Sequence, residues 1–388
     1  MKSEWKVVCL GDITKWSSGG TPSKNNSLYW KGTIPWISAK NMPDGWVDDA
    51  EPKITELGLN NGSRLAPPKS ILILVRGSGL YNRRYICITR KAVAFNQDVK
   101  CIEPNDEVLP EFLYYWLHGN DKSLVSLLET TGIGAGKFDT KRLQQLRVVL
   151  PSLQEQKKII SLLCSLDDKI ELNNKINENL ELQAQILYKH CFPYSVDDTL
   201  PDGWCVGTVG EIIEIHDSKR IPLSGAERAK MEKKVYPYYG AASLMDFVDD
   251  YIFDGKYLLL GEDGTVVDDA GYPILQYVWG QFWVNNHAHI LTGKRGFNVE
   301  SLYMLFKQTP VKHIVTGAVQ PKISQSNLSS IHVVIPPEKL LIEYNYWTEP
   351  LFAFIRTNKE ANKSLTILRD TLLPKLMSGE IDAGDVTI

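Results

Sequence analysis

Two lysines stand in the same local setting in distant parts of the chain. Lys137 follows the pair Thr131-Gly132, and Lys322 follows the pair Thr316-Gly317. A lysine on a glycine-rich turn carries a mobile positive charge that could contact a phosphate group. The alternative is an ordinary solvated surface lysine. Because the arrangement is repeated, the sequence favours two phosphate contacts over two unrelated surface charges.

Charge is distributed unevenly, although the whole chain has a formal charge of −3. Residues 61–100 contain eight basic residues and a single acid, Asp98. Within this stretch Arg76 ends an apolar run, and its guanidinium could bind a guanine edge or a phosphate. This part of the chain is therefore predicted to face phosphates.

Residues 241–290 have the opposite balance, with eight acids and one base, Lys256. There Glu262 and Asp263 could accept hydrogen bonds from the amino groups of cytosine or adenine, the alternative being an acidic turn. Further groups that could read base edges here are Asn285, Asn286 and His287, with Tyr238 and Tyr239 beside them. Phosphate contacts in this part would fall to Lys219, Arg220, Lys230, Lys233, Lys234 and Lys322.

Motifs that would indicate catalysis or metal binding are incomplete. The run from Gly132 to Lys137 resembles a phosphate loop, but that pattern needs glycine at the position of Thr131 and serine or threonine at that of Phe138. His287 and His289 could share a strand face as metal ligands, yet no third ligand stands at a telling spacing. The chain also lacks an N-P-P-[FYW] methylation motif and an S-adenosylmethionine loop. We expect no metal, no cofactor and no catalytic residue in this chain.

Two long helices are predicted to position these groups. Residues 152–192 contain neither glycine nor proline, and apolar residues recur in alternating steps of four and three, which is the pattern of a coiled-coil seam. At roughly 1.5 Å per residue this helix would be about 60 Å long. The seam residues are Leu166, Ile170, Asn173, Asn177, Leu180 and Leu187, and 185 positions later Leu351, Ile355, Asn358, Asn362, Leu365 and Leu372.

The repeated seam indicates that two similar helices pack against each other. One such seam could be an ordinary amphipathic core helix. Two copies with asparagine at matching positions favour pairing, because buried asparagine costs stability and is tolerated where it fixes register. The match continues upstream to Thr131 and Thr316, which indicates an internal duplication.

The duplication predicts an α+β protein with two similar mixed α/β domains and two antiparallel coiled-coil helices. The first domain would span 1–150, with a helix at 110–128 and short strands at 34–38, 71–75, 92–95 and 146–150. The first helix would span 151–192, a linker 193–200, the second domain 201–336 and the second helix 337–379. In the repeat, 236–240 would match 34–38, and 257–264 would match 72–79.

Composition places the chain among globular proteins of the cytoplasm. Hydrophobic residues make up 43%, and no apolar run approaches the length of a membrane span. The start of the chain lacks the apolar core of a signal peptide. The six cysteines form no Cys-x-x-Cys pair, which favours reduced thiols over disulfides or zinc ligands.

Several motifs in a fixed order carry a family resemblance. The first half contains Ser18-Gly-Gly-Thr-Pro-Ser23, Tyr29-Trp-Lys-Gly-Thr-Ile-Pro-Trp-Ile-Ser38 and Leu150-Pro-Ser-Leu-Gln-Glu-Gln-Lys157. The second half contains Pro237-Tyr-Tyr-Gly-Ala241, Gly261-Glu-Asp-Gly264, Trp283-Val-Asn-Asn-His-Ala-His289 and the ending Leu372-Leu-Pro-Lys-Leu-Met-Ser-Gly-Glu-Ile381. With these motifs and the duplicated helix, the chain resembles the specificity subunit of type I restriction-modification systems over essentially its whole length.

This resemblance implies a chain that recognises DNA and catalyses nothing by itself. Each of two target-recognition domains would read one half of a bipartite site in double-stranded DNA, and the helices would set the spacer between the halves. The implied partners are two modification subunits, which bind S-adenosylmethionine and methylate adenine, and in some complexes restriction subunits with nuclease and translocase activity. S-adenosylmethionine would thus belong to the partner.

The residues predicted to contact DNA lie in both domains. In the first they are Ser18, Gly19, Gly20, Thr21, Lys24, Arg76, Ser78, Arg83, Arg84 and Lys137. In the second they are Lys219, Arg220, Tyr238, Tyr239, Glu262, Asp263, Asn285, Asn286, His287, Gln320 and Lys322. Two other functions stay open: the recognition part of a single-chain DNA methyltransferase or restriction enzyme, and a helical scaffold that binds only protein. Cofactor binding by the isolated chain would favour the enzyme, whereas unlike loops on matched frames disfavour the scaffold.

Overall fold

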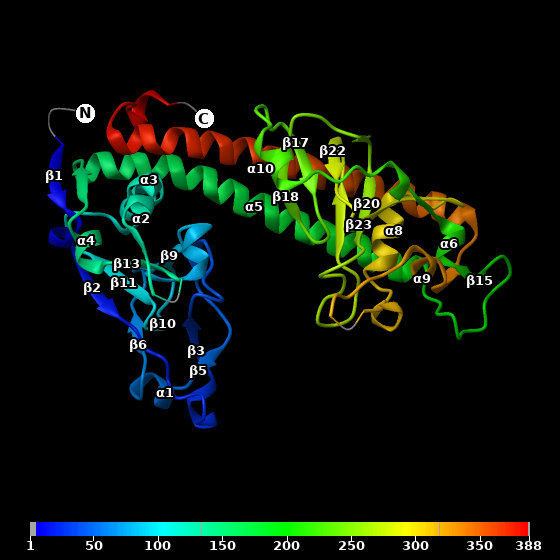
Figure 1. The fold of residues 1–388 in the computed structure, drawn as a ribbon, viewed down its shortest axis with the longest axis horizontal. Coiled ribbons are helices and arrows are strands. Elements are labelled where there is room, and N and C mark those ends of the chain that lie inside the picture. The colour runs from blue at the N-terminus through cyan, green and yellow to red at the C-terminus, as the bar shows by residue number, and fades with distance from the viewer. Residues whose placement is uncertain (1–4, 133, 318, 387–388) are drawn as a thin grey trace. The chain divides into compact units, whose positions relative to one another are not determined.

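The computed structural model describes residues 5–132, 134–317 and 319–386. The chain divides into two compact units, each described here by itself (Figure 1). The first unit combines Met1–Glu171 with Ala361–Ile388, and the second unit is Leu172–Glu360. The two long helices, α5 (Leu153–Cys191) and α10 (Glu338–Ser378), contribute residues to both units.

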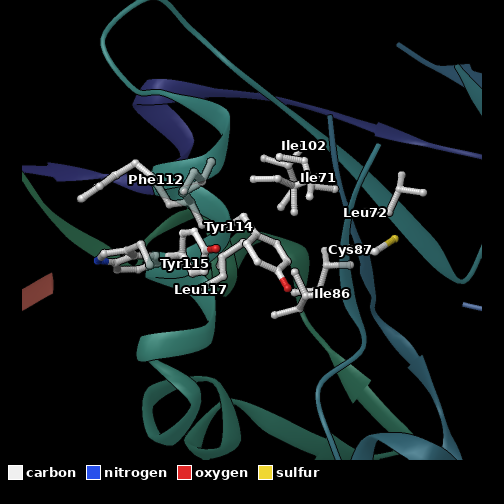
Figure 2. Packing of buried hydrophobic residues seen from close by; sticks show 14 of the residues in the cluster. Ile71, Leu72, Ile86, Cys87, Ile102, Phe112, Tyr114, Tyr115 and Leu117 are labelled. Atoms are coloured by element: carbon white, nitrogen blue, oxygen red, sulfur yellow. The ribbon is translucent and has the colours of Figure 1, made fainter. Parts of the chain in front are cut away.

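The first unit is built around a five-stranded sheet with the strand order β2-β11-β7-β9-β4. These strands are β2 (Thr14–Ser18), β11 (Val99–Pro104), β7 (Ile71–Leu74), β9 (Ile86–Thr89) and β4 (Gly45–Val47). Every residue of the apolar central strand β7 is buried. Helix α2 (Pro110–Gly119) packs on this sheet, and Figure 2 shows Phe112 and Leu117 gathered against Ile71 and Ile86.

Smaller sheets complete the first unit. A four-stranded sheet has the order β5 (Lys53–Ile54), β3 (Trp30–Ile37), β10 (Val93–Phe95) and β6 (Arg64–Ala66). A three-stranded sheet has the order β12 (Leu128–Thr130), β13 (Gly136–Phe138) and β8 (Arg76–Gly77). Strand β1 (Lys6–Cys9) pairs with β14 (Arg147–Leu150), and the short helices are α1 (Glu56–Asn60), α3 (Asp121–Ser126) and α4 (Thr140–Gln144).

The second unit repeats this plan. Its main sheet has the order β16 (Ile213–Ile215), β23 (Ala288–Gly293), β20 (Tyr257–Gly261) and β21 (Leu275–Val278). Its second sheet has the order β18 (Leu244–Val248), β17 (Tyr236–Tyr239), β22 (Gln281–Val284) and β19 (Phe253–Asp254). Strand β15 (Cys205–Thr208) pairs with β24 (His332–Ile335), and the helices are α6 (Val209–Ile212), α7 (Gly225–Ala229), α8 (Val299–Phe306) and α9 (Gln325–Ser329). The two mixed α/β frames therefore confirm the predicted internal duplication.

Strand register corrects one detail of the predicted repeat. In β7, Ile71 pairs with Ile102 of β11, and in β20 the corresponding residue, Leu258, pairs with Leu291 of β23. Residues 71–77 thus match 258–264, an offset of 187 positions. The prediction matched 72–79 with 257–264, an offset of 185 positions, and is therefore wrong by two residues. Because both strands are continuous apolar runs, the sequence pattern could not distinguish the two registers. The corrected register places Arg76 and Asp263 at equivalent positions.

The predicted helix over 110–128 is interrupted. It ends as α2 at Gly119, and α3 begins at Asp121. Between them Asn120 donates hydrogen bonds from its backbone nitrogen, at 3.1 Å, and its side-chain nitrogen, at 2.8 Å, to the carbonyl oxygen of Trp116. Asparagine competes in this way with regular helix hydrogen bonds. The apolar periodicity continues through Asn120, so the sequence pattern does not reveal the break between α2 and α3.

Within each unit the segments of α5 and α10 run side by side in opposite directions (Figure 1). In the first unit Leu163 and Leu166 belong to the same apolar core as Leu372 and Leu376. In the second unit the core of the helix pair is formed by Ala184, Tyr188, Tyr344, Phe352 and Ile355. All twelve predicted seam residues are buried or partly buried. The predicted pair of coiled-coil helices is therefore confirmed.

The start of α5 is anchored by a buried glutamine. The side-chain oxygen of Gln156 accepts from the backbone nitrogen of Leu109 at 2.8 Å, and its nitrogen donates to the carbonyl oxygens of Glu107 and Pro151, each at 3.0 Å. These bonds join the helix to the loop before α2. No helix in the described ranges is both long and apolar enough to cross a membrane.

Candidate nucleic-acid interface

Four distant segments of the second unit meet at the end of its main sheet. Two of the segments follow strands: Arg220 lies after β16 and Glu262 lies after β20. The other two precede an element: His287 lies before β23 and Lys322 lies before α9. Asp263 and Lys322 form an antiparallel β-bridge that closes this junction. The structure thus brings together groups that lie about one hundred residues apart in the sequence.

Charged side chains hold this junction together. The Nη1 atom of Arg220 lies 2.6 Å from Oε2 of Glu262 and donates to the carbonyl oxygen of Ala288 at 2.8 Å. On the other side of Glu262, Nζ of Lys322 lies 3.2 Å from Oε1. Both oxygens of Glu262 are therefore engaged within the protein, and its side chain is only 13% exposed. The structure gives Glu262 a supporting role, and a direct contact with a base stays a prediction.

A buried histidine and aspartate lie behind this pair. His289 is 0% exposed, with Nδ1 2.6 Å from Oδ2 of Asp217 and Nε2 2.8 Å from the carbonyl oxygen of Ile323. A carboxylate and a carbonyl can only accept hydrogen bonds, so the imidazole satisfies both only when it carries a proton on each nitrogen. Asp217 also accepts from the side chain of Gln325 at 2.6 Å and from the backbone nitrogen of Ile290 at 3.0 Å.

These partners lower the pKa of two carboxyl groups. Burial alone would raise the pKa of Asp217, but the hydrogen bond and charge of His289 outweigh it, and the pKa lies below its ordinary value. Burial likewise opposes ionisation of Glu262, and its bond to Arg220 with the charges of His289 and Arg220 brings the pKa below the ordinary value. Both groups are thus held as carboxylates, and the opposite charges around them compensate their burial.

Asp217, Glu262 and His289 could in principle share a cation, because their ligand atoms lie within 4.8 Å of one another. Each of these atoms already has a protein partner, however, and the guanidinium of Arg220 lies 3.4 Å from Asp217. The group is therefore a network of paired charges. The expectation that this chain binds no metal stays a prediction.

The same junction contains a second pair, nearer the surface. Nδ1 of His287 is hydrogen-bonded to Oδ1 of Asp263, and the His287 side chain is 44% exposed. The backbone nitrogen of His287 donates to Oδ1 of Asn285 at 2.8 Å, which fixes the turn before β23. Asn285 itself is only 4% exposed. This asparagine therefore shapes the turn and does not reach the surface, which does not support its predicted contact with DNA.

Tyr238 is likewise directed inward. It is 2% exposed, its hydroxyl oxygen accepts from the backbone nitrogen of Leu223 at 3.1 Å, and the Arg228 guanidinium lies 4.9 Å from its ring centre. Tyr239 is partly buried against Phe282. The structure offers a packing role for both tyrosines and does not support Tyr238 as a DNA contact. The predicted residues exposed in this unit are Lys219, Lys230, Lys233, Lys234, Asn286, Gln320 and Lys322.

The equivalent edge of the first unit has smaller polar groups. Nζ of Lys100 is hydrogen-bonded to the hydroxyl of Ser18, and the hydroxyl of Thr21 donates to Gln97 at 2.6 Å. Between them Gly19 and Gly20 let the loop approach other backbone closely. A side chain at Gly19 would place Cβ 2.0 Å from the carbonyl oxygen of Phe95. Close packing thus explains glycine at these positions, and the backbone nitrogen of Gly20 donates to the carbonyl oxygen of Phe95, the last residue of β10, at 2.9 Å.

Arg76 and Lys137 lie directly opposite each other on the paired strands β8 and β13. Both residues are exposed, and on the other side of β13 Lys137 is also paired with Glu129 of β12, whose carboxylate lies 2.7 Å from Arg142. Like charges in this position repel each other, because opposed Cβ atoms on paired strands are roughly 5 Å apart. The equivalent pair in the second unit is Asp263 and Lys322, which carries opposite charges. The same position of the frame therefore has different chemistry in the two units.

Other bases of the first unit are partly neutralised. Arg84 lies 3.1 Å from Asp121, Lys69 lies 3.4 Å from Glu111, and Arg90 lies 3.0 Å from Glu171. The basic stretch predicted from the sequence therefore presents fewer unpaired charges than its composition suggests. Further predicted residues at the surface are Lys24, Ser78 and Arg83, whose guanidinium lies 4.3 Å from the ring centre of Tyr85.

Three groups that build these sites are not among the predicted residues. They are Asp217 and Gln325, which are hydrogen-bonded to each other, and Lys100, which is hydrogen-bonded to the loop at Ser18. Asp217 lies two residues after β16 and is 7% exposed, and a buried carboxylate of this kind gives no distinct sequence pattern. Ile133 and Ala318, in the two glycine-rich turns, lie outside the described residues.

Comparison with known proteins agrees with this duplicated architecture. The chain matches the family described as Type I restriction modification DNA specificity domain over residues 2–182 and again over residues 201–340. It is 27% identical over 417 residues to the specificity subunit of the type I restriction enzyme MjaIX from Methanocaldococcus jannaschii, with 97% of this chain and 94% of that protein covered. It is 34% identical over 188 residues to the EcoR124I/EcoR124II specificity subunit from Escherichia coli, covering 48% of this chain and 45% of that protein.

A solved structure shares the fold. The S subunit of a type I restriction-modification system from M. genitalium has a TM-score of 0.57 at 18% identity, covering 97% of this chain and 96% of that chain. The family match covers most of the sequence and falls separately on each of the two repeated halves. This protein therefore belongs to the specificity subunits of type I restriction-modification systems.

Proposed function

We propose that this chain supplies the sequence recognition of a type I restriction-modification complex, in which each α/β domain reads one half of a bipartite DNA site. The observation that carries the proposal is the contrast at one position of the repeated frame. Arg76 faces Lys137 in the first unit, and Asp263 faces Lys322 in the second. Matched frames with unlike side chains are expected of two readers with different targets.

The first domain contributes a pair of cations to the DNA contact. Arg76 and Lys137 place two positive charges side by side, and a polyanion beside them would be attracted, although Glu129 opposite Lys137 offsets part of that charge. Arginine can also bind the O6 and N7 atoms of guanine with two hydrogen bonds, whereas lysine serves mainly as a phosphate contact. We assign Arg76 to base or phosphate recognition and Lys137 to the phosphate backbone.

The second domain depends less on free cations. Lys322 is paired with Glu262 at 3.2 Å, and Arg220 is held between Glu262 and Asp217. Lys219, Lys230 and Lys233 remain exposed and can contact phosphates. The contribution of the second domain to DNA affinity is therefore expected to be less sensitive to salt than that of the first domain, because fewer counterions are released when the second domain binds.

The helix pair would set the spacer between the two half-sites. The paired residues Asn177 and Asn358 lie in a seam of otherwise mainly apolar contacts, and this supports a single register of α5 against α10. The distance along the helices would then fix the number of base pairs between the half-sites. Helix length, and not the composition of the loops, would thus determine the spacer.

Two modification subunits are proposed to bind the helices. In the second unit α10 has a second apolar face, opposite the seam, which we call the outer stripe: Ile342, Tyr346, Trp347, Pro350 and Phe354. Tyr346 is 73% exposed and Trp347 is 61% exposed. Exposed aromatic residues of this kind are typical of protein interfaces. The partner would bring S-adenosylmethionine and the methylation chemistry, and the complex would act on DNA in the cytoplasm; restriction subunits could join it.

The experiment that tests this proposal is single-molecule sequencing of DNA from a methylation-free host that expresses the chain together with its modification subunit. The control omits the chain. A split, nonpalindromic methyladenine motif that requires the chain is the expected result. A protein scaffold would give no chain-dependent motif, and a single-chain enzyme would give a motif without the partner, so either outcome would refute the proposal.

A further inference from the structure

The pair Asp263 and His287 differs in its exposure from the network of Asp217, Glu262 and His289. Asp217, Glu262 and His289 have side chains that are at most 13% exposed and bond to other protein atoms. The His287 side chain, at 44% exposed, uses only Nδ1 for a protein contact among the described residues. Its second ring nitrogen, Nε2, is thus available to a ligand.

The partner of Nδ1 determines what Nε2 can do. The carboxylate of Asp263 only accepts hydrogen bonds, so Nδ1 of His287 must carry the proton. In the neutral ring Nε2 is then an acceptor. The bond also fixes the plane of the ring, and the buried Asn285 fixes the backbone of His287 from the other side.

An acceptor at this position selects among base edges. In the major groove adenine presents its N6 amino group and cytosine its N4 amino group as donors, whereas guanine and thymine present acceptors at the corresponding positions. Lysine and arginine cannot make this distinction, because they only donate. The neighbouring Asn286 is exposed and could add a bidentate contact to adenine.

We propose that His287 is a specificity-determining residue of the second domain, which accepts a hydrogen bond from the amino group of an adenine or cytosine, and that Asp263 is its positioning residue. The inference rests on the proposed function of this chain as a DNA reader. It changes the predicted role of Asp263, which supports the histidine and does not itself contact a base.

The experiment determines the base preference at every position of the methylated motif in the complex of full-length chain and modification subunit. The half-site of the second domain is identified first, as the half that changes when residues 201–336 are exchanged for those of a relative. His287→Ala should then reduce the preference for adenine or cytosine by about tenfold at one position of that half-site. Every position of the other half-site should remain unchanged.

Asp263 is tested by two variants. Asp263→Asn keeps an oxygen that can accept from Nδ1, so it should retain most of the preference. Asp263→Ala cannot hold the ring and should relax the same position as His287→Ala. If Asp263 had only a general structural role, its replacement would weaken methylation at all positions of the motif, and Asp263→Asn and Asp263→Ala would have the same effect.

The matched control is His332→Ala, because His332 is an exposed histidine on β24 of the same unit. It should leave the motif unchanged. The inference is overturned if His287→Ala and Asp263→Ala leave every position of the second half-site as it was, or if they alter both half-sites equally. If His287→Ala fails to accumulate, the two Asp263 variants test the inference: a base preference retained in Asp263→Asn and lost in Asp263→Ala supports it, and equal preferences contradict it. Failure of the proposed function can be distinguished from failure of this inference, because in that case even the unaltered chain would give no methylated motif.

Discussion

Asn358 donates a hydrogen bond from Nδ2 to Oδ1 of Asn177 at 2.9 Å inside the helix seam of the second unit. Each residue is 7% exposed, and Nδ2 of Asn177 has no protein partner in the described part of the chain. A buried amide that is only partly satisfied costs stability. Its presence in the seam is explained by selection of one register, because a slip along the helix would separate Asn177 from Asn358 and break this hydrogen bond.

Asn358→Ala should lower the free energy of unfolding by about 1–3 kcal/mol, because Oδ1 of Asn177 would lose its donor while staying buried. Replacing both asparagines by leucine should restore stability, since it removes the buried polar atoms altogether. Urea unfolding of the full chain measures both effects. Asn179→Ala, at an exposed position of α5, should change stability by less than about 0.5 kcal/mol. A double leucine variant as unstable as Asn358→Ala would contradict this account.

The second unit should lose stability in acid through Asp217. The folded pKa of this carboxyl lies below its ordinary value of 3.8, so the unfolded chain binds the proton more readily. Its contribution is therefore fully present above the unfolded pKa and is lost as pH falls through the folded pKa. Urea midpoints measured from pH 7 down to about pH 3 should fall steeply below about pH 5.

Asp217→Asn should flatten that acid dependence and destabilise the second unit by about 3 kcal/mol at neutral pH, because His289 and Arg220 would lose their counter-charge. Asp269→Asn is the matched control, at an exposed position of the same unit. If the Asp217 variant keeps the same slope between pH 5 and pH 3 as the unaltered chain, other groups cause the acid loss.

The two lysines on equivalent turns should differ in their contribution to DNA binding. Lys137→Gln should lower affinity for all sequences and reduce the slope of log K against log salt by about 0.9, as expected for one lost phosphate contact. Lys322→Gln should reduce the slope less, because Lys322 is already paired with Glu262. Fluorescence anisotropy of the complex with labelled DNA at several salt concentrations measures both slopes. Lys122→Gln, on α3, is the exposed control. Equal slopes for the Lys137 and Lys322 variants would show that the ion pair of Lys322 with Glu262 does not affect the salt dependence of DNA binding.

The outer stripe of α10 should be required for binding of the modification subunit. Trp347→Glu should weaken that association by at least about 2 kcal/mol, because a charge would replace an exposed aromatic anchor. Titration calorimetry with the purified modification subunit gives the affinity. Val125→Glu places the same charge at an exposed apolar position of α3 and should have no effect. Unchanged affinity of the Trp347 variant would move the docking site to another surface.

The elements of this fold were predictable where one pattern determines one structure. The spacing of Leu166, Asn177 and Leu180 matches only a helix with one buried face, and the repeat at 185 positions identified its partner. The apolar run at residues 71–74 showed a buried strand but not its register, because each of its residues suits either face. Only the pairing of Ile71 with Ile102 decided that Arg76 is equivalent to Asp263.

The site was predictable as a set of segments but not as a set of contacts. Exposed candidates such as Lys137 and Lys219 were found because their type and turn setting are informative. Tyr238 and Asn285 are of types that often bind nucleic acid, yet the sheet packing directs both inward. The link between Asp217 and His289 joins residues 72 positions apart, and no local pattern reveals which distant charges will meet.

In the proposed function, the length of the helices sets the number of base pairs between the two half-sites. A seven-residue insertion that continues the seam, placed after Glu171 and after Glu360, tests it most directly. At roughly 1.5 Å per residue each helix grows by about 10 Å, which corresponds to about three base pairs of DNA. Sequencing of methylated DNA should show a spacer longer by about three base pairs with both half-sites unchanged. An unaltered spacer, or a change in either half-site, would contradict the account.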